Sequence, residues 1–320
     1  MVALGDCAYA SDMEEHAFAI GEAGYPEPLR RIDDPPAVLY ARGRLARGLA
    51  EGAAIGPAVA IVGARDATAY GLAVARDLGG ELARRGFAVV SGLALGVDGA
   101  AHRGALDAGG LTIAVVGAGT DVVYPRAHGR LRADILASGA VVGELPAGTR
   151  AFPQHFPARN RIISGLALGV IVVEATMRSG SLSTARHALE QGREVFAVPG
   201  PVTSLRSRGP HALLKLGARL VESVDDVLSE LPAGDVALAA PRRVVQIASP
   251  RCVGVLDRIA NGAASVDQVA AEEGRQVGEI LQDLLELELS GMIVRGPGGR
   301  FAVTPAAVAR PREGSGVAVD

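Results

Sequence analysis

Short apolar runs alternate with longer segments of helical periodicity between residues 58 and 231. Each run is three to five residues long and is dominated by Val, Ile and Ala, which is typical of strands buried on both faces of a sheet. The predicted strands are Val59–Val62, Ala88–Ser91, Thr112–Val116, Val141–Gly143, Val170–Glu174, Glu194–Val198 and Arg219–Val221.

Helical patterns fill the segments between these runs. In Tyr70–Arg85, for example, apolar residues recur at helical spacing through Leu72, Ala75, Leu78 and Leu82. Further helices are predicted over Gly99–Ala108, His128–Ala137, Leu182–Gln191, Pro210–Leu216 and Val224–Glu230. Regular alternation of strand and helix predicts an α/β fold with a doubly wound, mostly parallel sheet, in which ligands bind at the carboxyl ends of the strands.

The segments outside this region differ in pattern. Residues 1–57 predict a short helical preface and connector, with a weak helix over Asp12–Ala23 and a short edge strand over Val38–Tyr40. Residues 232–250 are rich in Ala, Pro and Arg and predict a linker, and residues 306–320 predict a disordered tail. Residues 251–305 predict three helices and a β-hairpin, which indicates a small winged-helix domain. Its second helix opens with a capping box at Ser265.

Composition restricts the classes of function. The net charge of −3 means that any nucleic-acid binding depends on a local patch of cations. Cys7 and Cys252 lie far apart without zinc-ligand spacing, so neither a metal nor a cofactor is expected. No apolar run approaches the roughly 18 residues that a membrane span needs, and the chain is expected to be cytoplasmic.

The stretch from Phe152 to Thr184 combines three features of an anion site. A cluster of Arg159, Asn160 and Arg161 precedes a buried apolar run, and a Gly/Ser-rich loop then leads into a helix. The free N–H groups and the dipole at a helix start favour an anion, and nearby guanidinium groups favour a phosphate. The alternative interpretation is a polar loop with solvated arginines.

Two further loops follow predicted strands at the same end of the sheet. Gly63 and Arg65 follow the first strand, and Ser91 ends the second strand with Gly92 directly after it. A glycine at such a position lets the backbone approach a ligand closely. Phe156 and its neighbours could provide flat faces on which bases stack, as in single-strand binders, or they could pack in the core.

Familiar nucleotide motifs are incomplete in this chain. No GxxxxGK[ST] sequence is present, which argues against a P-loop. Gly117-x-Gly119 matches only part of the dinucleotide fingerprint, and His102 beside Asp98 is a weak candidate for a general base.

Residues 25–230 carry a set of motifs that together resemble the DNA-processing protein A family (DprA, also called Smf). The motifs are Val62-Gly-Ala-Arg65, Ser91-Gly-Leu-Ala-Leu-Gly-Val-Asp-Gly-Ala-Ala-His102, Tyr124-Pro125, His155-Phe-Pro-Ala-Arg-Asn-Arg-Ile-Ile-Ser164, Val172-Val-Glu-Ala175, Ser179-Gly-Ser-Leu-Ser-Thr-Ala185 and Gln191-Gly-Arg-Glu-Val-Phe-Ala-Val-Pro-Gly200. The resemblance implies an extended Rossmann-like fold, a homodimer and binding of single-stranded DNA. It further implies protection of incoming DNA and loading of a RecA-type recombinase during natural transformation.

The resemblance also implies a DNA pocket at Arg65, with Arg159, Asn160, Arg161 and the loop from Ser179 to Thr184. With the strand-end positions, the predicted DNA-binding and phosphate-binding residues are Gly63, Arg65, Ser91, Gly92, Arg159, Asn160, Arg161, Ser179, Gly180, Ser181 and Thr184. The chain departs from the family pattern at Ala64 and Gly143, where the family usually has Ser, and in the loop Ser207–His211.

Two hypotheses of function follow. The first is a non-catalytic protein that binds single-stranded DNA. The second is a nucleotide-processing enzyme similar to the phosphoribohydrolases, but Arg186 and His187 stand where that family has its catalytic carboxylate. The predicted third helix of the winged-helix domain, Gln276–Glu288, is acidic, which favours contact with a protein over contact with duplex DNA, with Arg295 and Arg300 available for weak assistance.

Overall fold

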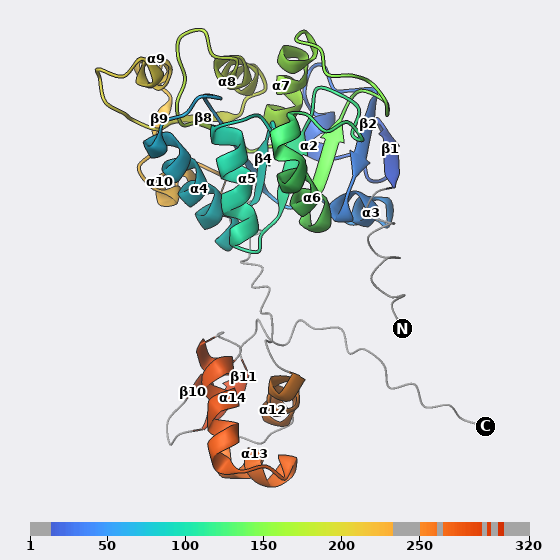
Figure 1. Cartoon of the computed structure of the whole chain (residues 1–320), viewed down its shortest axis with the longest axis vertical. Helices are drawn as coiled ribbons and strands as arrows, with labels where there is room; N and C mark the ends of the chain where they lie inside the picture. Colours follow the sequence, from blue (N-terminus) through green and yellow to red (C-terminus); the bar gives the residue numbers. More distant parts are fainter. Residues whose placement is uncertain (1–13, 233–249, 261–264, 290–292, 296–299, 304–320) are drawn as a thin grey trace, which may run out of the picture. The chain divides into compact units, whose positions relative to one another are not determined.

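The computed structural model describes residues 14–232, 250–260, 265–289, 293–295 and 300–303. The chain forms two compact units that divide between Arg242 and Arg243 (Figure 1). Most of the predicted linker, the predicted tail, Cys7 and the hairpin turn at 296–299 lie outside the described residues.

The first unit is built on a nine-stranded sheet in the order β1-β2-β6-β5-β4-β3-β7-β8-β9. The strands are β1 (Glu15–Ala19), β2 (Val38–Arg42), β3 (Ala58–Val62), β4 (Ala88–Ser91), β5 (Thr112–Val115), β6 (Ala140–Gly143), β7 (Gly169–Val172), β8 (Glu194–Ala197) and β9 (Arg219–Leu220). All neighbours from β6 to β9 pair in parallel, whereas β1 and β2 are antiparallel additions. The predicted mostly parallel sheet is confirmed.

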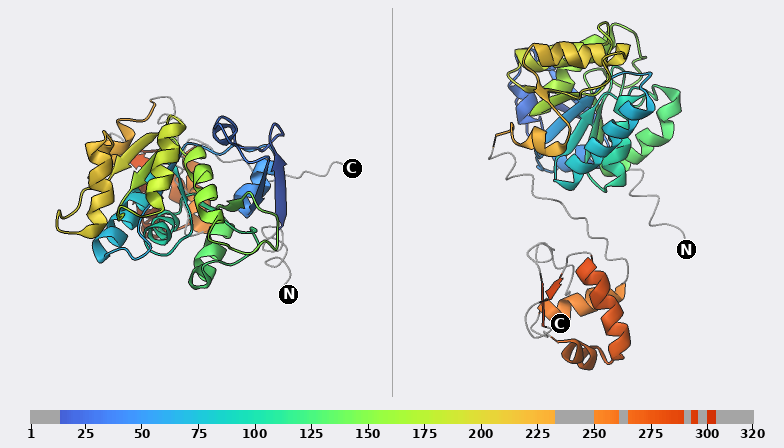
Figure 2. Two further views of the ribbon diagram at one scale, coloured as in Figure 1. Left: turned by 90° about the horizontal axis from the view of Figure 1, so that it is seen from above. Right: turned by 90° about the vertical axis from the view of Figure 1, so that its left-hand side faces the viewer.

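Helices cover both faces of this sheet (Figure 1). They are α2 (Glu27–Arg30), α3 (Arg44–Ala50), α4 (Ala69–Arg84), α5 (Val97–Asp107), α6 (Gly129–Ser138), α7 (His155–Gly165), α8 (Ser181–Glu190), α9 (Arg208–Lys215) and α10 (Val224–Leu228). Side chains alternate between the faces of β3, so that Val59 and Ile61 pack with α4 and α5, while Ala60 and Val62 pack with α7 and α8. Figure 2 shows the sheet between these helical layers from two further directions.

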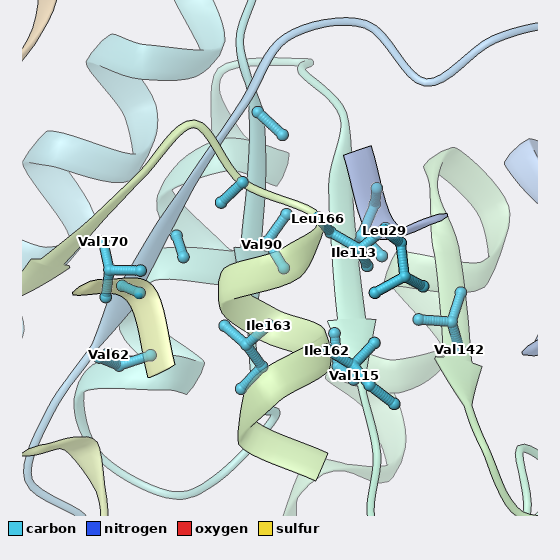
Figure 3. Close-up of a cluster of buried hydrophobic side chains, with 14 of the residues drawn as sticks. Leu29, Val62, Val90, Ile113, Val115, Val142, Ile162, Ile163, Leu166 and Val170 are labelled. Carbon is cyan, nitrogen blue, oxygen red and sulfur yellow. The ribbon is translucent and has the colours of Figure 1, made fainter. Parts of the chain in front are cut away.

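The core between α7 and the sheet is aliphatic. Ile162, Ile163 and Leu166 lie on the side of α7 that faces Val90 and Val115, and all five side chains are buried (Figure 3). Burial of each such side chain contributes about 1.5–3 kcal/mol, so α7 is fixed firmly against the strands.

Two predictions about the first 57 residues are wrong. The segment expected to be helical contains strand β1, which pairs with β2 from Glu15↔Arg42 to Ala19↔Val38. Strand β2, expected at the edge, lies inside the sheet between β1 and β6. Pairing with β2 and burial of Phe18 outweigh the weak helical pattern of this short segment.

Helix α7 is not among the helices predicted from the sequence, because prolines such as Pro153 and Pro157 are typical of turns. Pro157 is the third residue of the helix, in the first turn, where the missing N–H costs no intrahelical hydrogen bond.

The second unit contains α12 (Pro250–Ala260), α13 (Val266–Glu273), α14 (Val277–Leu289) and a hairpin of β10 (Ile293–Arg295) and β11 (Phe301–Val303). The predicted capping box at Ser265 is confirmed by its reciprocal bonds with Gln268. Three helices with a two-stranded wing form the predicted winged-helix domain. No helix within the described residues combines the length and apolarity required to cross a membrane.

Candidate nucleic-acid interface

The main pocket of the first unit lies where the strand order reverses. Strands β3 and β7 are neighbours, with Val62 paired to Val172, but their following helices α4 and α8 lie on opposite faces of the sheet. The loops that leave their carboxyl ends therefore diverge, and a crevice opens between them. It encloses about 520 Å³ and is bordered by the first turns of α7.

Eight of the eleven residues predicted from the sequence line this pocket. They are Gly63, Arg65, Arg159, Asn160, Ser179, Gly180, Ser181 and Thr184. Gly92 lines a smaller adjoining cavity of about 70 Å³. Most of the residues predicted from the sequence thus lie together at one edge of the sheet.

The loop after β3 presents Arg65 at the mouth of the pocket. Gly63 is required here because a Cβ would lie 2.6 Å from Val97 Cγ2 and 2.9 Å from the Glu174 carbonyl oxygen. The Arg65 side chain is exposed and lies over the Phe156 ring, 5.4 Å from its centroid. Among the described residues, no carboxylate forms an ion pair with Arg65, so its charge is available to a ligand.

Glu174 fixes the far end of the same loop. Its carboxylate accepts hydrogen bonds from the Thr68 backbone N–H at 2.8 Å and from the Thr68 hydroxyl at 2.7 Å. Thr68 in turn caps the N-terminus of α4 by accepting from Gly71 N–H. The buried carboxylate at the end of β7 therefore positions the loop that carries Arg65.

Aromatic rings form the wall beside Arg65. Tyr124 stacks on Phe156 with ring centroids 5.4 Å apart and an interplanar angle of 28°. Tyr124 is 45 % exposed and lines both the main pocket and the smaller cavity. Such faces accept unpaired bases by stacking, and a nearby guanidinium strengthens the contact.

The loop after β7 supplies small polar groups. The Ser179 and Ser181 hydroxyls lie 2.7 Å apart, and the Gly180 carbonyl oxygen accepts from Asn160 Nδ2 at 3.2 Å. The N-terminus of α8 begins at Ser181, so its partial positive charge is directed at the pocket. This loop has the composition of a phosphate-binding turn.

Arg159 lies in the floor of the pocket rather than at its mouth. Its guanidinium donates to the carbonyl oxygens of Gly92, at 2.8 Å, and of Val115. Burial lowers the pKa of Arg159 to about 10, although the nearby Asp98 opposes this shift. Burial likewise raises the pKa of Asp98, against the attraction of Arg159 and two backbone N–H donors. This arginine therefore holds the loop after β4 in place.

Arg161 and Ser91 are not brought to either cavity. Two residues of an α-helix span about 200°, so Arg161 faces away from Arg159. Its guanidinium bonds to Glu144 at 2.7 and 2.9 Å and forms an ion pair with Asp34. The Ser91 hydroxyl donates to the Ile61 carbonyl oxygen at 2.6 Å and is fully buried. These contacts correct the expectation that both arginines of the cluster and Ser91 face one ligand.

Tyr124 and Glu174 were missed as site residues. Tyr124-Pro125 was noted only as a motif of the family resemblance, yet it follows β5 at the same edge of the sheet, which is the signal that could have placed it at the pocket. Glu174 was read only as the last residue of a strand. A carboxylate where a buried strand enters a polar loop usually has a backbone partner, which is the signal that could have identified it.

Comparisons with known proteins point to the same family along most of the chain. The family model described as DNA recombination-mediator protein A matches residues 16–232, and the DprA winged helix domain matches residues 245–299. Protein Smf of Escherichia coli is 43% identical over 303 residues, covering 89% of this chain and 76% of that protein. The DNA processing protein DprA of Bacillus subtilis is 45% identical over 226 residues, covering 71% and 74%.

Solved structures show the same relationship. DNA processing protein A from Streptococcus pneumoniae superimposes with a TM-score of 0.63 at 43% identity, covering 70% of this chain and 76% of that one. DNA processing protein A from Helicobacter pylori, described by its unique single-stranded DNA binding mode, superimposes with a TM-score of 0.60 at 29% identity, covering 69% and 99%.

Proposed function

The chain belongs to the DNA recombination-mediator protein A family, and on this premise we propose that it is a non-catalytic protein that binds single-stranded DNA in the pocket between β3 and β7. The observation that carries the proposal is the exposed, carboxylate-free Arg65 guanidinium beside the Tyr124–Phe156 stack. The relative from Helicobacter pylori, which is described as binding single-stranded DNA, supports the same ligand class.

The chemistry of the pocket favours an unpaired strand over a duplex. The ring faces of Tyr124 and Phe156 can stack only on a base whose own face is open, and bases in a duplex are covered by their neighbours. Arg65 and the Ser179–Ser181 turn supply a cation and hydroxyl groups for the phosphates on either side of such a base. Stacking and phosphate contacts do not distinguish sequences, so we expect weak sequence preference.

The pocket offers little for hydrolysis of a nucleotide. Of its two carboxylates, Asp66 pairs with Arg206 at 2.5 Å, and Asp98 is buried and accepts from two backbone N–H groups. Arg186 and His187, which replace the carboxylate of the phosphoribohydrolases, both lie within reach of Glu190 on α8. A free general acid or base is lacking among the described pocket residues.

The family membership also supports a role in recombination. We propose that the protein acts in the cytoplasm, protects incoming single-stranded DNA and loads a RecA-type recombinase onto it during natural transformation. A homodimer fits the exposed apolar side chains at edge strand β9, where Leu216 is 82% exposed and Leu220 47%. Covering them with a second copy would remove this apolar surface from water.

The test is fluorescence anisotropy with labelled single strands and the matching duplex at several salt concentrations. We expect clear preference for the single strand and a loss of at least tenfold in affinity for Arg65→Ala. The salt slope of this variant should decrease by about 0.7, the value for one lost phosphate contact on single strands. Arg84→Ala is the matched control, because Arg84 is an exposed arginine in the last turn of α4, at the other end of that helix from the pocket. Equal affinity for both DNA forms, or equal losses for both variants, would contradict the proposal.

A further inference from the structure

A pair of opposite charges lies on the rim of the pocket, between the loop after β3 and the loop after β8. Asp66 lines the pocket directly after Arg65 in the chain. Its carboxylate accepts a hydrogen bond from Arg206 Nη2 at 2.5 Å, and Arg206 Nε donates to the Asp66 carbonyl oxygen at 2.8 Å. An acidic side chain thus borders a site for an anionic ligand, and it occupies the arginine beside it.

The Asp66–Arg206 pair is exposed enough to be exchanged for another anion. The side chain of Asp66 is 76% exposed and that of Arg206 is 33% exposed. Ion pairs in such positions contribute little to stability, because water and dissolved salt compete for both charges. A phosphodiester presents two oxygens to a guanidinium, as a carboxylate does, and accepts the same paired N–H bonds. A DNA phosphate can therefore replace the carboxylate on Arg206.

The backbone holds Arg206 at the rim without help from the Asp66 carboxylate. Ala175 N–H donates to the Arg206 carbonyl oxygen at 2.7 Å, and Gly209 N–H donates to the Ala175 carbonyl oxygen at 2.8 Å. Ala175 follows β7, so these two bonds fix the loop after β8 to the other wall of the pocket. Loss of the carboxylate would free one end of the guanidinium and leave the arginine in place.

Arg65 and Asp66 contact different neighbours although they are adjacent in the chain. Arg65 lies over Phe156 in the aromatic wall, whereas Asp66 bonds to Arg206 on the loop after β8. A strand with one base at the aromatic wall carries a phosphate on each side of that base. Arg65 is available to one of these phosphates, and Arg206 becomes available to a neighbouring one only when Asp66 releases it.

We propose that Arg206 is a second phosphate-binding residue of this site and that Asp66 occupies its guanidinium in the absence of DNA. A backbone phosphate of the bound strand takes the place of the Asp66 carboxylate. Asp66 thereby lowers the affinity for DNA in two ways, because it has to be displaced and because its charge repels the strand. This inference rests on the proposed binding of single-stranded DNA in the pocket.

The test measures the affinity of the full chain for a labelled single strand by fluorescence anisotropy at several salt concentrations. The variants are Asp66→Asn alone, Asp66→Asn with Arg206→Ala, and Asp66→Asn with Arg206→Lys. The matched control is Asp107→Asn, which removes the same charge from an exposed pair of the same length, Arg76–Asp107 at 2.5 Å. Asp107 is the last residue of α5, whose first turn contains the pocket residue Asp98. The control therefore lies at the far end of that helix.

We expect Asp66→Asn to bind the single strand roughly fivefold more tightly than the wild type, and Asp107→Asn to bind it as the wild type does. Adding Arg206→Ala to Asp66→Asn should weaken binding at least fivefold and reduce the salt slope by about 0.7, the value for one phosphate contact. Adding Arg206→Lys instead should keep most of that slope, because the cation remains.

Four results would overturn the inference. They are no gain in affinity for Asp66→Asn, an equal gain for Asp107→Asn, the same salt slope for Asp66→Asn with and without Arg206→Ala, and a full loss of that slope with Arg206→Lys. The comparison of Asp66→Asn with the wild type stays decisive if the Arg206 variants unfold. A wild type without preference for single strands would refute the proposed function and this inference together, whereas a clear preference with unchanged variants would refute this inference alone.

Discussion

Arg161→Ala removes a guanidinium that is close to Arg159 in sequence but faces away from the pocket. Arg161 is only 11% exposed and forms two hydrogen bonds with Glu144, at 2.7 and 2.9 Å, and one with the Asp34 carbonyl oxygen, at 2.8 Å. These contacts join α7 to the segment before β2, which contains Asp34, and to the segment after β6, which contains Glu144. The substitution is therefore expected to lower stability without lowering the affinity for DNA.

The expected loss of stability depends on how exposed Glu144 and Asp34 are to water. Hydrogen bonds to charged groups contribute roughly 1.5–3 kcal/mol when buried. Glu144 is 35% exposed and Asp34 83% exposed, so water replaces part of what is lost and the Asp34 pair contributes little. A net cost of about 2 kcal/mol is expected. With a urea m-value of about 3 kcal/mol/M, the midpoint should fall by roughly 0.7 M.

Tyrosine fluorescence is a suitable probe, because all five tyrosines lie within the first unit and the chain has no tryptophan. Urea melts and DNA titrations of Arg161→Ala and Arg65→Ala form the comparison. We expect Arg161→Ala to be less stable than the wild type and to bind DNA with an unchanged salt slope. We expect Arg65→Ala to be as stable as the wild type and to bind DNA with a reduced salt slope. A reduced salt slope for Arg161→Ala would refute the orientation of α7 described above.

Three further substitutions test the site and its support. Burial lowers the pKa of His102 to about 3 from 6.5, so the unfolded chain binds a proton that the folded chain does not, and stability falls as pH drops through this window. In urea melts, the wild type should lose roughly 2 kcal/mol more stability than His102→Gln between about pH 7.5 and 5, and equal pH dependence of the two proteins would contradict this reasoning. Phe156→Leu keeps an apolar wall but loses the stacking face, so single-strand affinity should fall by about 1–3 kcal/mol in anisotropy titrations, and unchanged affinity would show that bases stack elsewhere. Gly92→Ala places a Cβ 2.6 Å from the Arg159 guanidinium, and a thermal midpoint equal to the wild type would disprove this close contact.

Strands β3 to β8 could be predicted because each is a short, largely apolar run packed between the helices on the two faces of the sheet. From β3 to β9, every predicted strand is present with ends that shift by no more than two residues. Strand β1 could not be predicted, because a five-residue segment with one buried phenylalanine gains its order from pairing with β2, a tertiary contact.

The sequence predicted which loops come together at the pocket, but not the direction of each side chain. Parallel strands bring their carboxyl ends together, so loops after β3 and β7 had to meet. The cluster Arg159–Arg161 was expected to act as one group because its helix was not recognised. On a helix, neighbouring arginines have different environments, and here one bonds to carbonyl oxygens in the floor of the pocket while the other pairs with Glu144.

The two walls of the pocket are far apart along the chain. Residues 62–66 form one side and residues 176–184 the other, and they meet only because β7 inserts beside β3. A nascent chain on the ribosome therefore has no binding crevice until β7 and the start of α8 have emerged and docked. Arg65 is synthesised early, but it can hold a polynucleotide only after more than half of the polypeptide has been made.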